Sequence, residues 1–490
     1  MKIHIDVTSE IVPHDICVGC GICSGGCPSN NIPMKWAENG DRIPFKVNDC
    51  PPTCNVCLDL CPFNDHYDKK TLNIMNEDSI AKETFSDISG INYTFETGYY
   101  LNCYAGWIND NSKRMQSSSG GMLTWTIEYL LQNNLVDAAV VVRESKKNQD
   151  VMFEYYIANN LEELKGSSSS RYYPVDMGNI IRQMNERDNE KRFVVVGLPC
   201  ALKGLRFSMK KFPRLRKRIK YMLGIVCGHT PNKYYSEYIS RMSGLDITST
   251  KRVDFRVKDQ TNRAGNYNLV GINNSGEKGK YVPFLSVASM WSNGAFQHNA
   301  CNYCDDVFAE VADAVFMDAW LPRYEHDVKG TSLILTRNPD IKEVLEKGSK
   351  LGNCYVESVE VNDIIKSQEG LVFVKKQEIA GRLFNAINKG EKVPTKRVQP
   401  SKEEFEKRKV FIEAKKNIQE ESKKEWGRYR EEDNLEPFNE SMKQLARPLL
   451  RHKKIKRMER VIKNPYVLLR LLPHSIVNLL PSKLKERALK

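Results

Sequence analysis

Two runs of cysteines near the N-terminus constrain this chain more than any other feature of its sequence. Eight of the 14 cysteines lie within the first 80 residues, in two runs that each end in Cys-Pro. The first run is Cys17-x2-Cys20-x2-Cys23-x3-Cys27-Pro28, and the second is Cys50-x3-Cys54-x2-Cys57-x3-Cys61-Pro62. Hydrophobic periodicity is weak here, so metal ligation rather than an apolar core is expected to hold the segment together. The sequence therefore predicts a metal-binding domain over residues 1–80.

The spacing of the first run is that of bacterial ferredoxins, which bind 4Fe–4S clusters. In two-cluster ferredoxins the fourth cysteine of each run ligates the other cluster. This rule predicts two sets of ligands: Cys17, Cys20, Cys23 and Cys61 for one cluster, and Cys50, Cys54, Cys57 and Cys27 for the other. Zinc is the alternative, but structural zinc sites usually take two ligand pairs separated by a spacer. The second run departs from the ferredoxin pattern at Cys50, which three residues rather than two separate from the next cysteine.

The composition limits the class of protein. A chain of 490 residues is long enough for two or three folding units, and 41% hydrophobic residues suffice to bury their cores. No run of about 18 apolar residues occurs, so no transmembrane helix is expected. The first residues lack the pattern of a secretory signal. We therefore expect a cytoplasmic protein whose thiols are reduced and available for metal.

Residues 93–390 show an α/β pattern. β-branched runs at 137–143, 192–197 and 221–227 predict buried strands, and Leu123 to Leu135 predicts a helix. Strands that alternate with helices indicate a parallel or mixed sheet, whose functional residues follow the strands. Residues 391–400 are predicted to be a linker, and Ser401 to Glu432 a charged helix.

Six cysteines lie outside the two runs. Cys200 and Cys227 end two predicted strands, and Cys301 and Cys304 form a C-x2-C pair. Three loops at one edge of a sheet would bring these four thiolates together, which suggests a third 4Fe–4S cluster. The alternatives are buried cysteines without a ligand, a redox-active pair and a zinc site. The remaining two, Cys103 and Cys354, have no partner pattern and are expected to be structural.

Several short blocks follow one another in the middle segment: Ser117 to Gly121 (SSSGG) with Thr124, Ser170-Arg171-Tyr172, 197–200 (GLPC), 224–227 (GIVC), 299–304 (NACNYC), 310–313 (EVAD) and 330–332 (GTS). By the order and spacing of these blocks, most of residues 95–340 resembles the beta subunit of coenzyme F420-reducing hydrogenase and its relatives. The resemblance implies a flavoprotein that binds FAD and one 4Fe–4S cluster, with cluster ligands at Cys200, Cys227, Cys301 and Cys304. Many members of that family also carry an N-terminal ferredoxin module.

The blocks suggest where a flavin would bind. The SSSGG loop precedes a predicted helix, whose first N–H groups suit the FAD pyrophosphate; a serine N-cap beside a glycine turn is the alternative. The candidate flavin-binding residues are Ser118, Ser119, Gly120, Gly121, Thr124, Ser170, Arg171 and Tyr172, with Lys165 as a further candidate for flavin or substrate. Relatives usually have lysine where this chain has Arg171, which keeps the charge but changes the hydrogen-bonding geometry. His229 is a candidate proton donor at the flavin, with a structural role as the alternative.

The predicted fold class is α/β, and α+β overall. Its parts are a two-cluster ferredoxin-like domain (1–80), a mixed-sheet α/β domain for FAD and one cluster (93–390), and a charged helical, basic extension (401–490). The predicted function is an iron–sulfur flavoprotein oxidoreductase that passes electrons between the clusters and FAD, with hydride transfer to or from an organic partner. That partner is coenzyme F420 or another small or sugar-linked acceptor, as in surface-polysaccharide synthesis. The alternatives are a relay subunit without its own substrate site, which exchanges electrons with ferredoxin or another redox partner protein, and a zinc-stabilised scaffold.

The positive charge is concentrated at the C-terminus. Residues 441–490 hold 14 Lys and Arg against two acidic residues, and so carry +12 of the net charge of +13. Apolar positions such as Leu445, Leu449 and Met458 fall near one face of a predicted helix. A basic amphipathic segment can lie on anionic lipid, which would make the protein peripheral at the inner membrane face. Docking on an acidic partner or on the protein's own body is the alternative, and nucleic acid is disfavoured because no recognition motif accompanies the charge.

Overall fold

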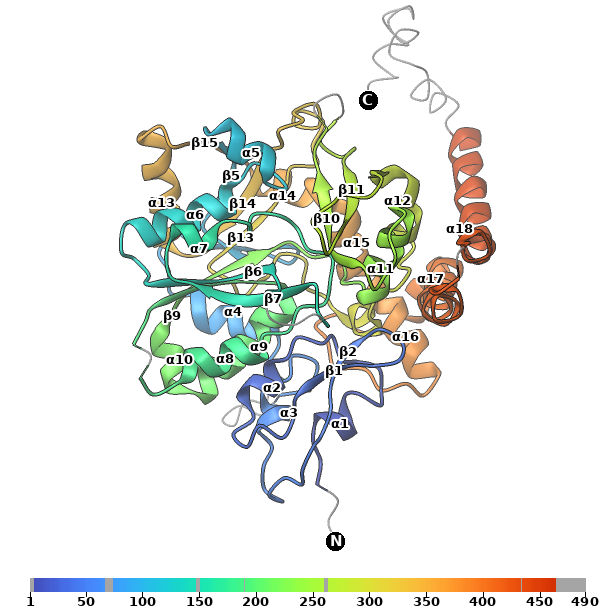
Figure 1. The fold of residues 1–490 in the computed structure, drawn as a ribbon, viewed down its shortest axis with the longest axis horizontal. Helices are drawn as coiled ribbons and strands as arrows, with labels where there is room; N and C mark the ends of the chain where they lie inside the picture. The colour runs from blue at the N-terminus through green and yellow to red at the C-terminus, as the bar shows by residue number, and fades with distance from the viewer. Residues whose placement is uncertain are drawn as a thin grey trace, which may run out of the picture.

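An eight-stranded mixed sheet forms the centre of the molecule (Figure 1). The structure is a computed structural model that describes residues 4–66, 74–146, 150–188, 190–259, 263–432 and 434–463. Across the sheet the order is β15 (Cys354–Ser358), β5 (Asn102–Ile108), β14 (Ser332–Thr336), β13 (Ala314–Asp318), β9 (Ile219–Ile225), β8 (Phe193–Gly197), β6 (Ala138–Glu144) and β7 (Phe153–Ala158). The pairs β13–β9, β9–β8 and β8–β6 are parallel and the others antiparallel. The prediction of a mixed α/β sheet is confirmed.

The three strands predicted from β-branched runs are β6, β8 and β9, which lie side by side in the parallel part of the sheet. All five residues of β8 are buried, because helices cover both faces of the sheet and leave no polar side. The helix predicted from Leu123 is α6 (Met122–Gln132).

Two apolar layers hold the helices to the sheet. On one face lie α6 and α13 (Pro339–Lys350). On the other lie α8 (Gly178–Asn185), α9 (Pro199–Lys211), α10 (Pro213–Arg218) and α14 (Val361–Ser367). Shorter elements complete this region: α4 (Glu77–Phe85), α5 (Asn111–Gln116), α7 (Leu161–Leu164), α15 (Glu369–Phe373) and the hairpin β3 (Asn92–Thr94) with β4 (Gly98–Tyr100).

A second, antiparallel sheet lies beside the main one (Figure 1). It consists of β10 (Thr250–Val257), β11 (Asn268–Asn273) and β12 (Val282–Pro283), with α11 (Lys233–Met242) and α12 (Phe284–Ser292). Its core is aromatic: Tyr235 stacks on Phe255 at 6.1 Å between ring centroids. The short η1 (Asn299–Tyr303) follows α12 and carries one of the predicted cluster ligands, Cys301.

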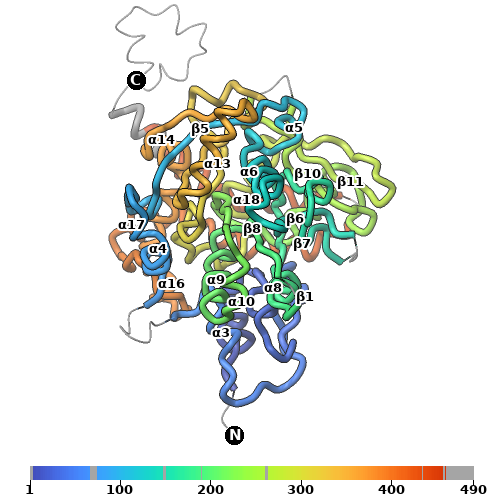
Figure 2. The backbone as a smooth tube through the Cα atoms, turned by 90° about the vertical axis from the view of Figure 1, so that its left-hand side faces the viewer, coloured from blue at the N-terminus to red at the C-terminus, as the bar shows by residue number. Residues whose placement is uncertain are grey.

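The N-terminal segment packs beneath α8–α10 (Figures 1 and 2). It contains α1 (Val7–Glu10), α2 (Ile22–Gly26), α3 (Val56–Leu60) and the hairpin β1 (Met34–Trp36) with β2 (Arg42–Pro44). At Gly25 this segment lies so close to α8 that no side chain fits, because a Cβ there would lie 2.6 Å from the Gly178 carbonyl oxygen. The cysteine-rich segment is therefore fitted directly against the central domain.

The C-terminal elements are η2 (Val374–Glu378, a π-helical turn), α16 (Ile379–Asn388), α17 (Lys402–Tyr429) and α18 (Glu436–Lys463). The charged helix predicted at 401–432 is α17. Residues 391–400, predicted as a linker, instead lie between the N-terminal segment and the central domain. Thr395 N–H donates to Asp65 at 2.9 Å, and the Arg397 side chain is only 4% exposed.

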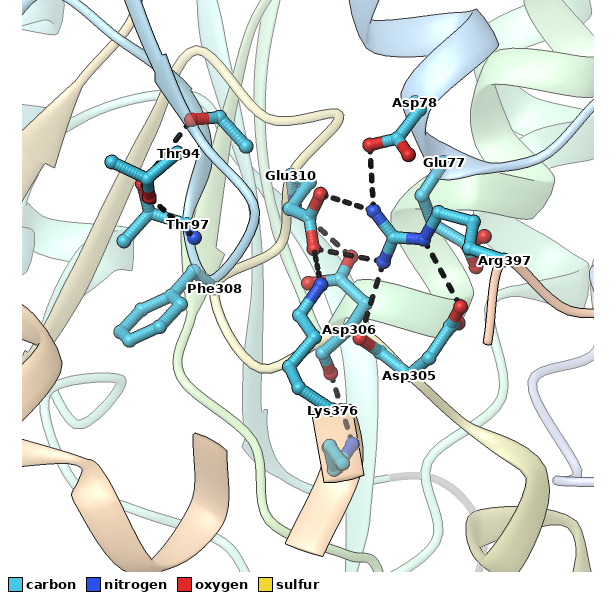
Figure 3. A network of polar contacts seen from close by, with 12 residues as sticks. Glu77, Asp78, Thr94, Thr97, Asp305, Asp306, Phe308, Glu310, Lys376 and Arg397 are labelled. Carbon is cyan, nitrogen blue, oxygen red and sulfur yellow. Dashed lines mark hydrogen bonds and ion pairs between the residues drawn. The ribbon is translucent and has the colours of Figure 1, made fainter. Parts of the chain in front are cut away.

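Arg397 is the centre of a buried ion network (Figure 3). Its guanidinium donates to Asp305 (3.0 Å), Glu310 (2.7 Å) and Asp78 (2.7 Å), which come from distant parts of the chain. The carboxylates of Asp305 and Glu310 are fully buried. Lys376 on η2 also pairs with Glu310, at 2.8 Å. The network thereby joins α4, the loop that follows Cys304 and the C-terminal elements.

The first part of the basic extension packs against the rest of the protein. In α18 the side chains of Phe438, Met442 and Leu449 are buried in the aromatic core, while Met458 is exposed. The apolar positions expected to share one lipid-binding face are thus divided between core and surface. Residues 464–490 lie outside the described residues. In the described part of the chain, we find no helix with the length and apolar character needed to span a membrane.

Candidate functional site

The first set of predicted cluster cysteines lies together in the N-terminal segment. Cys23 is in α2, and Cys61 is the C-cap of α3, the helix that packs on α2. Burial raises the pKa of the Cys23 thiol, and the nearby Cys20, Cys17 and Cys61 raise it further. These are the four cysteines that the ferredoxin rule assigns to one cluster.

Fewer contacts connect the four cysteines of the second set than those of the first set. Asn31 lies between two of its members: its backbone N–H donates to the Cys27 sulfur at 3.3 Å, and its side-chain amide to the Cys50 sulfur at 4.0 Å. Burial raises the pKa of the Cys57 thiol to about 11, with a contribution from Cys54. The pairs Cys27–Cys50 and Cys54–Cys57 are therefore each brought together.

The third set gathers at one edge of the main sheet. Cys200 lies in the first turn of α9, directly after β8, and Cys227 follows the adjacent parallel strand β9. Parallel neighbours end at the same edge, so these two cysteines meet there. Burial raises the pKa of the Cys200 thiol, and Cys20, Cys227, Cys304 and Cys301 raise it further.

Electrostatic contacts between the cysteine sets indicate their order in space. Cys57 of the second set adds to the pKa shift of Cys23 in the first set. In turn, Cys20 of the first set is the largest charged influence on Cys200 of the third set. The first set thus lies between the other two, and Cys20 lines the same cavity as Cys200.

In the described residues the cysteine sulfurs do not approach one another as closely as a single zinc ion requires. Four thiolates around one zinc at about 2.3 Å would lie roughly 3.8 Å apart. In the described residues no three cysteine sulfurs all lie within 4.8 Å of one another. Backbone N–H groups donate to several of the sulfurs, as Gly19 does to Cys17 (3.4 Å) and Thr230 to Cys301 (3.4 Å). Such donors are typical around iron–sulfur clusters, so the residues present fit 4Fe–4S clusters.

One buried cation also fits an anionic centre at the third set. Lys375 on η2 is 2% exposed, and its ammonium donates to the Cys304 sulfur (3.1 Å) and the Asp306 carbonyl (2.9 Å). No carboxylate in the described residues lies within the 4.0 Å of an ion pair with it. Burial lowers the pKa of Lys375, but attraction to Cys304, Cys227 and Cys301 outweighs this and raises it. Among the described residues, Cys304, Cys227 and Cys301 are thus the groups that most favour a charged Lys375.

A cavity of about 790 Å³ adjoins the third set. This volume is within the range of cofactor pockets. Of the sequence-predicted residues, Cys200, Cys227, Cys301, Ser118, Ser119, Gly121, Thr124, Ser170, Arg171, Tyr172 and His229 line it. Cys304, Gly120 and Lys165 are not among its lining residues, and Lys165 is exposed and pairs with Glu162.

The SSSGG loop and the 170–172 block meet at the cavity wall. Ser170 N–H donates to the Ser118 hydroxyl at 2.7 Å, although 52 residues separate them. Gly120 N–H donates to the Ser332 hydroxyl at 3.1 Å. A Cβ at Gly120 would lie 2.6 Å from the Gly106 carbonyl oxygen, so only glycine fits there. The loop places the first turn of α6 at the cavity wall. The N–H groups of that turn have no acceptor within the helix.

Two residues that carried no sequence signal hold this loop in place. Arg256 on β10 donates to the Ser118 carbonyl at 2.8 Å and pairs with Asp318 at 3.0 Å. Lys258, two residues along, donates to the carbonyls of Arg114 (2.8 Å) and Ser119 (2.9 Å). An alternating Arg-x-Lys on a strand is common, and only the packing of β10 against the loop gives it a role.

The remaining predicted residues line an aromatic wall. Tyr172 and His229 both contact Trp291, with ring centroids at 4.5 and 4.3 Å. Burial, together with the positive charges of Lys415 and Lys375, lowers the pKa of His229 to about 3. The imidazole is therefore neutral at pH 7, which suits hydrogen bonding better than proton donation. Arg171 lies over the Phe153 ring at 4.8 Å.

Comparison with known proteins finds two matching family models, both for the beta subunit of coenzyme F420 hydrogenase/dehydrogenase. The model of that subunit's N-terminal part matches residues 103–182, and the model of its C terminus matches residues 190–362. Together they span more than half of the chain. The cysteine-rich segment and all elements from α15 onward lie outside both matches.

Individual relatives agree with this result. A coenzyme F420-dependent sulfite reductase from Methanocaldococcus jannaschii is 24% identical over 396 residues, which cover 77% of this chain and 52% of that protein. The chain thus spans about half the length of that relative. A ferredoxin from the same organism is 38% identical over 56 residues, 11% of this chain and 69% of the ferredoxin. This match, with the cysteine-rich N-terminus, associates the chain with iron–sulfur clusters. A solved chain from the F420-reducing NiFe hydrogenase complex of Methanosarcina barkeri has a TM-score of 0.47 and 16% identity, and covers 62% of this chain and 99% of its own length.

Proposed function

Because the chain belongs to the coenzyme F420 hydrogenase/dehydrogenase beta-subunit family, we propose that it is an iron–sulfur flavoprotein oxidoreductase that exchanges electrons with a redox partner protein and hydride with an organic partner. The observation that carries this proposal is the shared cavity: Cys200, Cys227 and Cys301 line it together with the SSSGG loop. A one-electron centre and a two-electron cofactor would then be neighbours. Coenzyme F420 is the organic partner that the family name suggests, and a sugar-linked acceptor is the alternative.

The twelve predicted cysteines would hold three 4Fe–4S clusters, and the cavity would hold FAD. When bound, the clusters supply one-electron transfer and the flavin couples it to two-electron hydride chemistry. The chain's own residues contribute positioning. Cys20 and Cys200 keep the N-terminal and central sites adjacent, Ser118 and Ser170 fix the loop beside the cavity, and the free N–H groups of α6 suit the FAD pyrophosphate.

Anaerobic cofactor analysis tests the proposal directly. We expect the purified protein to contain about 12 iron atoms and one FAD per chain, with the paramagnetic signals of reduced clusters. Coenzyme F420, NAD(P)H and ferredoxin would then be screened as redox partners. Clusters without any flavin would instead support a relay subunit, and the absence of both would refute the proposal.

The contact between Lys375 and Cys304 predicts a shift in the reduction potential of the central cluster. Lys375→Met removes a buried positive charge, and we expect the midpoint potential to fall by roughly 100 mV, from a unit charge a few ångströms away at an effective dielectric constant of about 20. The measurement is a redox titration followed by electron paramagnetic resonance. Lys366→Met, an exposed charge change on α14, is the control. Equal potentials in the two variants would contradict the assignment.

The tight fit at Gly120 predicts a loss of flavin. In Gly120→Ala the new methyl group would meet the Gly106 carbonyl oxygen and Ser332, so the loop must move and flavin retention should fall about tenfold or more. Gly370→Ala is the control, because Gly370 lines the cavity itself but a Cβ there has nothing within 4 Å. Bound flavin per chain is read from absorbance. If Gly120→Ala keeps its flavin as well as Gly370→Ala does, the loop does not bind it.

A further inference from the structure

Part of the cavity wall, here called the C-terminal end, is built by elements outside the matched family regions. Ile412, Lys415 and Gln419 of α17 line it, at positions i, i+3 and i+7 of one helix face. Arg382 of α16 lines it as well. This end is therefore a feature that the C-terminal elements add to the family domain.

Several side-chain nitrogens at this end have no hydrogen-bond partner in the described part of the chain. His229 Nε2 and Arg382 Nε are buried and lack a hydrogen-bond partner in the described residues. Lys415 makes no hydrogen bond or ion pair there either, by the same distance limits. Buried donors without an acceptor are rare in native proteins, and each asks for an explanation such as a bound ligand.

The charge at this end is also unbalanced. Among the described lining residues near Lys415, Glu378 is the one that carries a carboxylate. Arg408 already donates two hydrogen bonds to Glu378, at 2.7 and 2.9 Å, and Arg382 lies 3.6 Å from it. Lys415 also lines the cavity, so three cationic side chains here face the single carboxylate of Glu378, and the net charge is positive. An anion would neutralise it.

Aromatic rings adjoin the same donors. The His229 ring packs on Trp291, and Trp291 packs on Tyr172. Flat apolar surface next to unpaired cationic donors suits a ring that carries a negatively charged substituent.

We propose that this end of the cavity binds the anionic group of a ring-bearing organic acceptor or donor, with Lys415 as its ionic contact and Arg382 and His229 as further donors. The inference rests on the proposed function, because it names the substrate class of that same cavity. It adds that α17, not the family domain, selects for a carboxylate or phosphate on the substrate.

The test measures binding of phenyl phosphate, with benzyl alcohol as an uncharged ring, to the full-length protein purified without oxygen. We expect the wild type to bind phenyl phosphate in preference to benzyl alcohol. Lys415→Met should weaken phenyl phosphate binding about tenfold or more, the effect of losing one charged hydrogen bond. Lys415→Arg should restore most of the affinity. Lys424→Met removes a lysine that pairs with Glu421 on the outside of the same helix and should leave the affinity unchanged.

Iron and flavin contents are measured in the same samples. Unchanged affinity in Lys415→Met, or no binding of phenyl phosphate by the wild type, would overturn the proposed subsite. Loss of flavin from Lys415→Met would also overturn it, because the charge would then serve the cofactor. A wild type without iron and flavin would refute the proposed function instead, while the anion affinities still decide the subsite.

Discussion

Replacing Arg397 by methionine is expected to lower the free energy of unfolding by about 3–5 kcal/mol. The guanidinium satisfies Asp305 and Glu310, whose side chains are fully buried, and removing one partner of a buried ion network leaves charge that nothing compensates. Lys396 and Lys376 retain contacts with these carboxylates, at 3.2 and 2.8 Å, so the expected loss is that of one partner rather than of the whole network. Urea unfolding under anaerobic conditions gives the measurement.

The control for this prediction is Arg428→Met. Arg428 pairs with Glu425 on α17, but its side chain is 72% exposed, and exposed ion pairs contribute at most about 1 kcal/mol. The prediction fails if the two variants unfold at the same urea concentration. Because Asp305 directly follows Cys304, the folded fraction of Arg397→Met should also hold less iron at the central site.

Cys200→Ser is expected to remove one cluster and spare two. Iron per chain should fall from about 12 to about 8, since one thiolate of four is lost at the central site and the N-terminal ligands are untouched. Flavin reduction by a partner protein should be strongly slowed, because Cys200 adjoins both the cavity and Cys20. Iron and sulfide analysis with paramagnetic resonance checks both parts.

Cys354→Ser serves as the matched control. Cys354 is also a free cysteine and is buried, but it lies on the edge strand β15, apart from the three sets. Its replacement should leave the iron content unchanged. If Cys200→Ser stays folded but loses all its iron, or keeps all of it, the division of the cysteines into three sets of four is wrong.

The sequence predicts those parts of this protein that depend on neighbours along the chain. The parallel core strands β6, β8 and β9 follow from β-branched runs, because such residues pack well on a surface buried on both sides. The ligand role of the N-terminal cysteines is predicted from their spacing, because cysteines on one short loop can bind the same cluster. Spacing alone leaves several roles open for the four cysteines Cys200, Cys227, Cys301 and Cys304. The family resemblance favours a shared cluster.

Other features depend on contacts that no local pattern encodes. Residues 391–400 have the composition of a linker, yet Arg397 lies in a buried network because its three carboxylate partners come from α4 and from the loop after η1. The same holds for Lys258 at the SSSGG loop and for Lys375 at Cys304. The apolar positions of α18 read as one face of an amphipathic helix, but packing on α17 uses some of them in the core.

The cysteine ligands and the class of cofactor can be predicted from the chain alone, because ligand type and spacing are local properties. The charges around the predicted site cannot be, because Lys375, Arg397 and Lys415 come from segments distant in sequence. Their effects depend on burial and on separations of a few ångströms, and these exist only once the chain has folded.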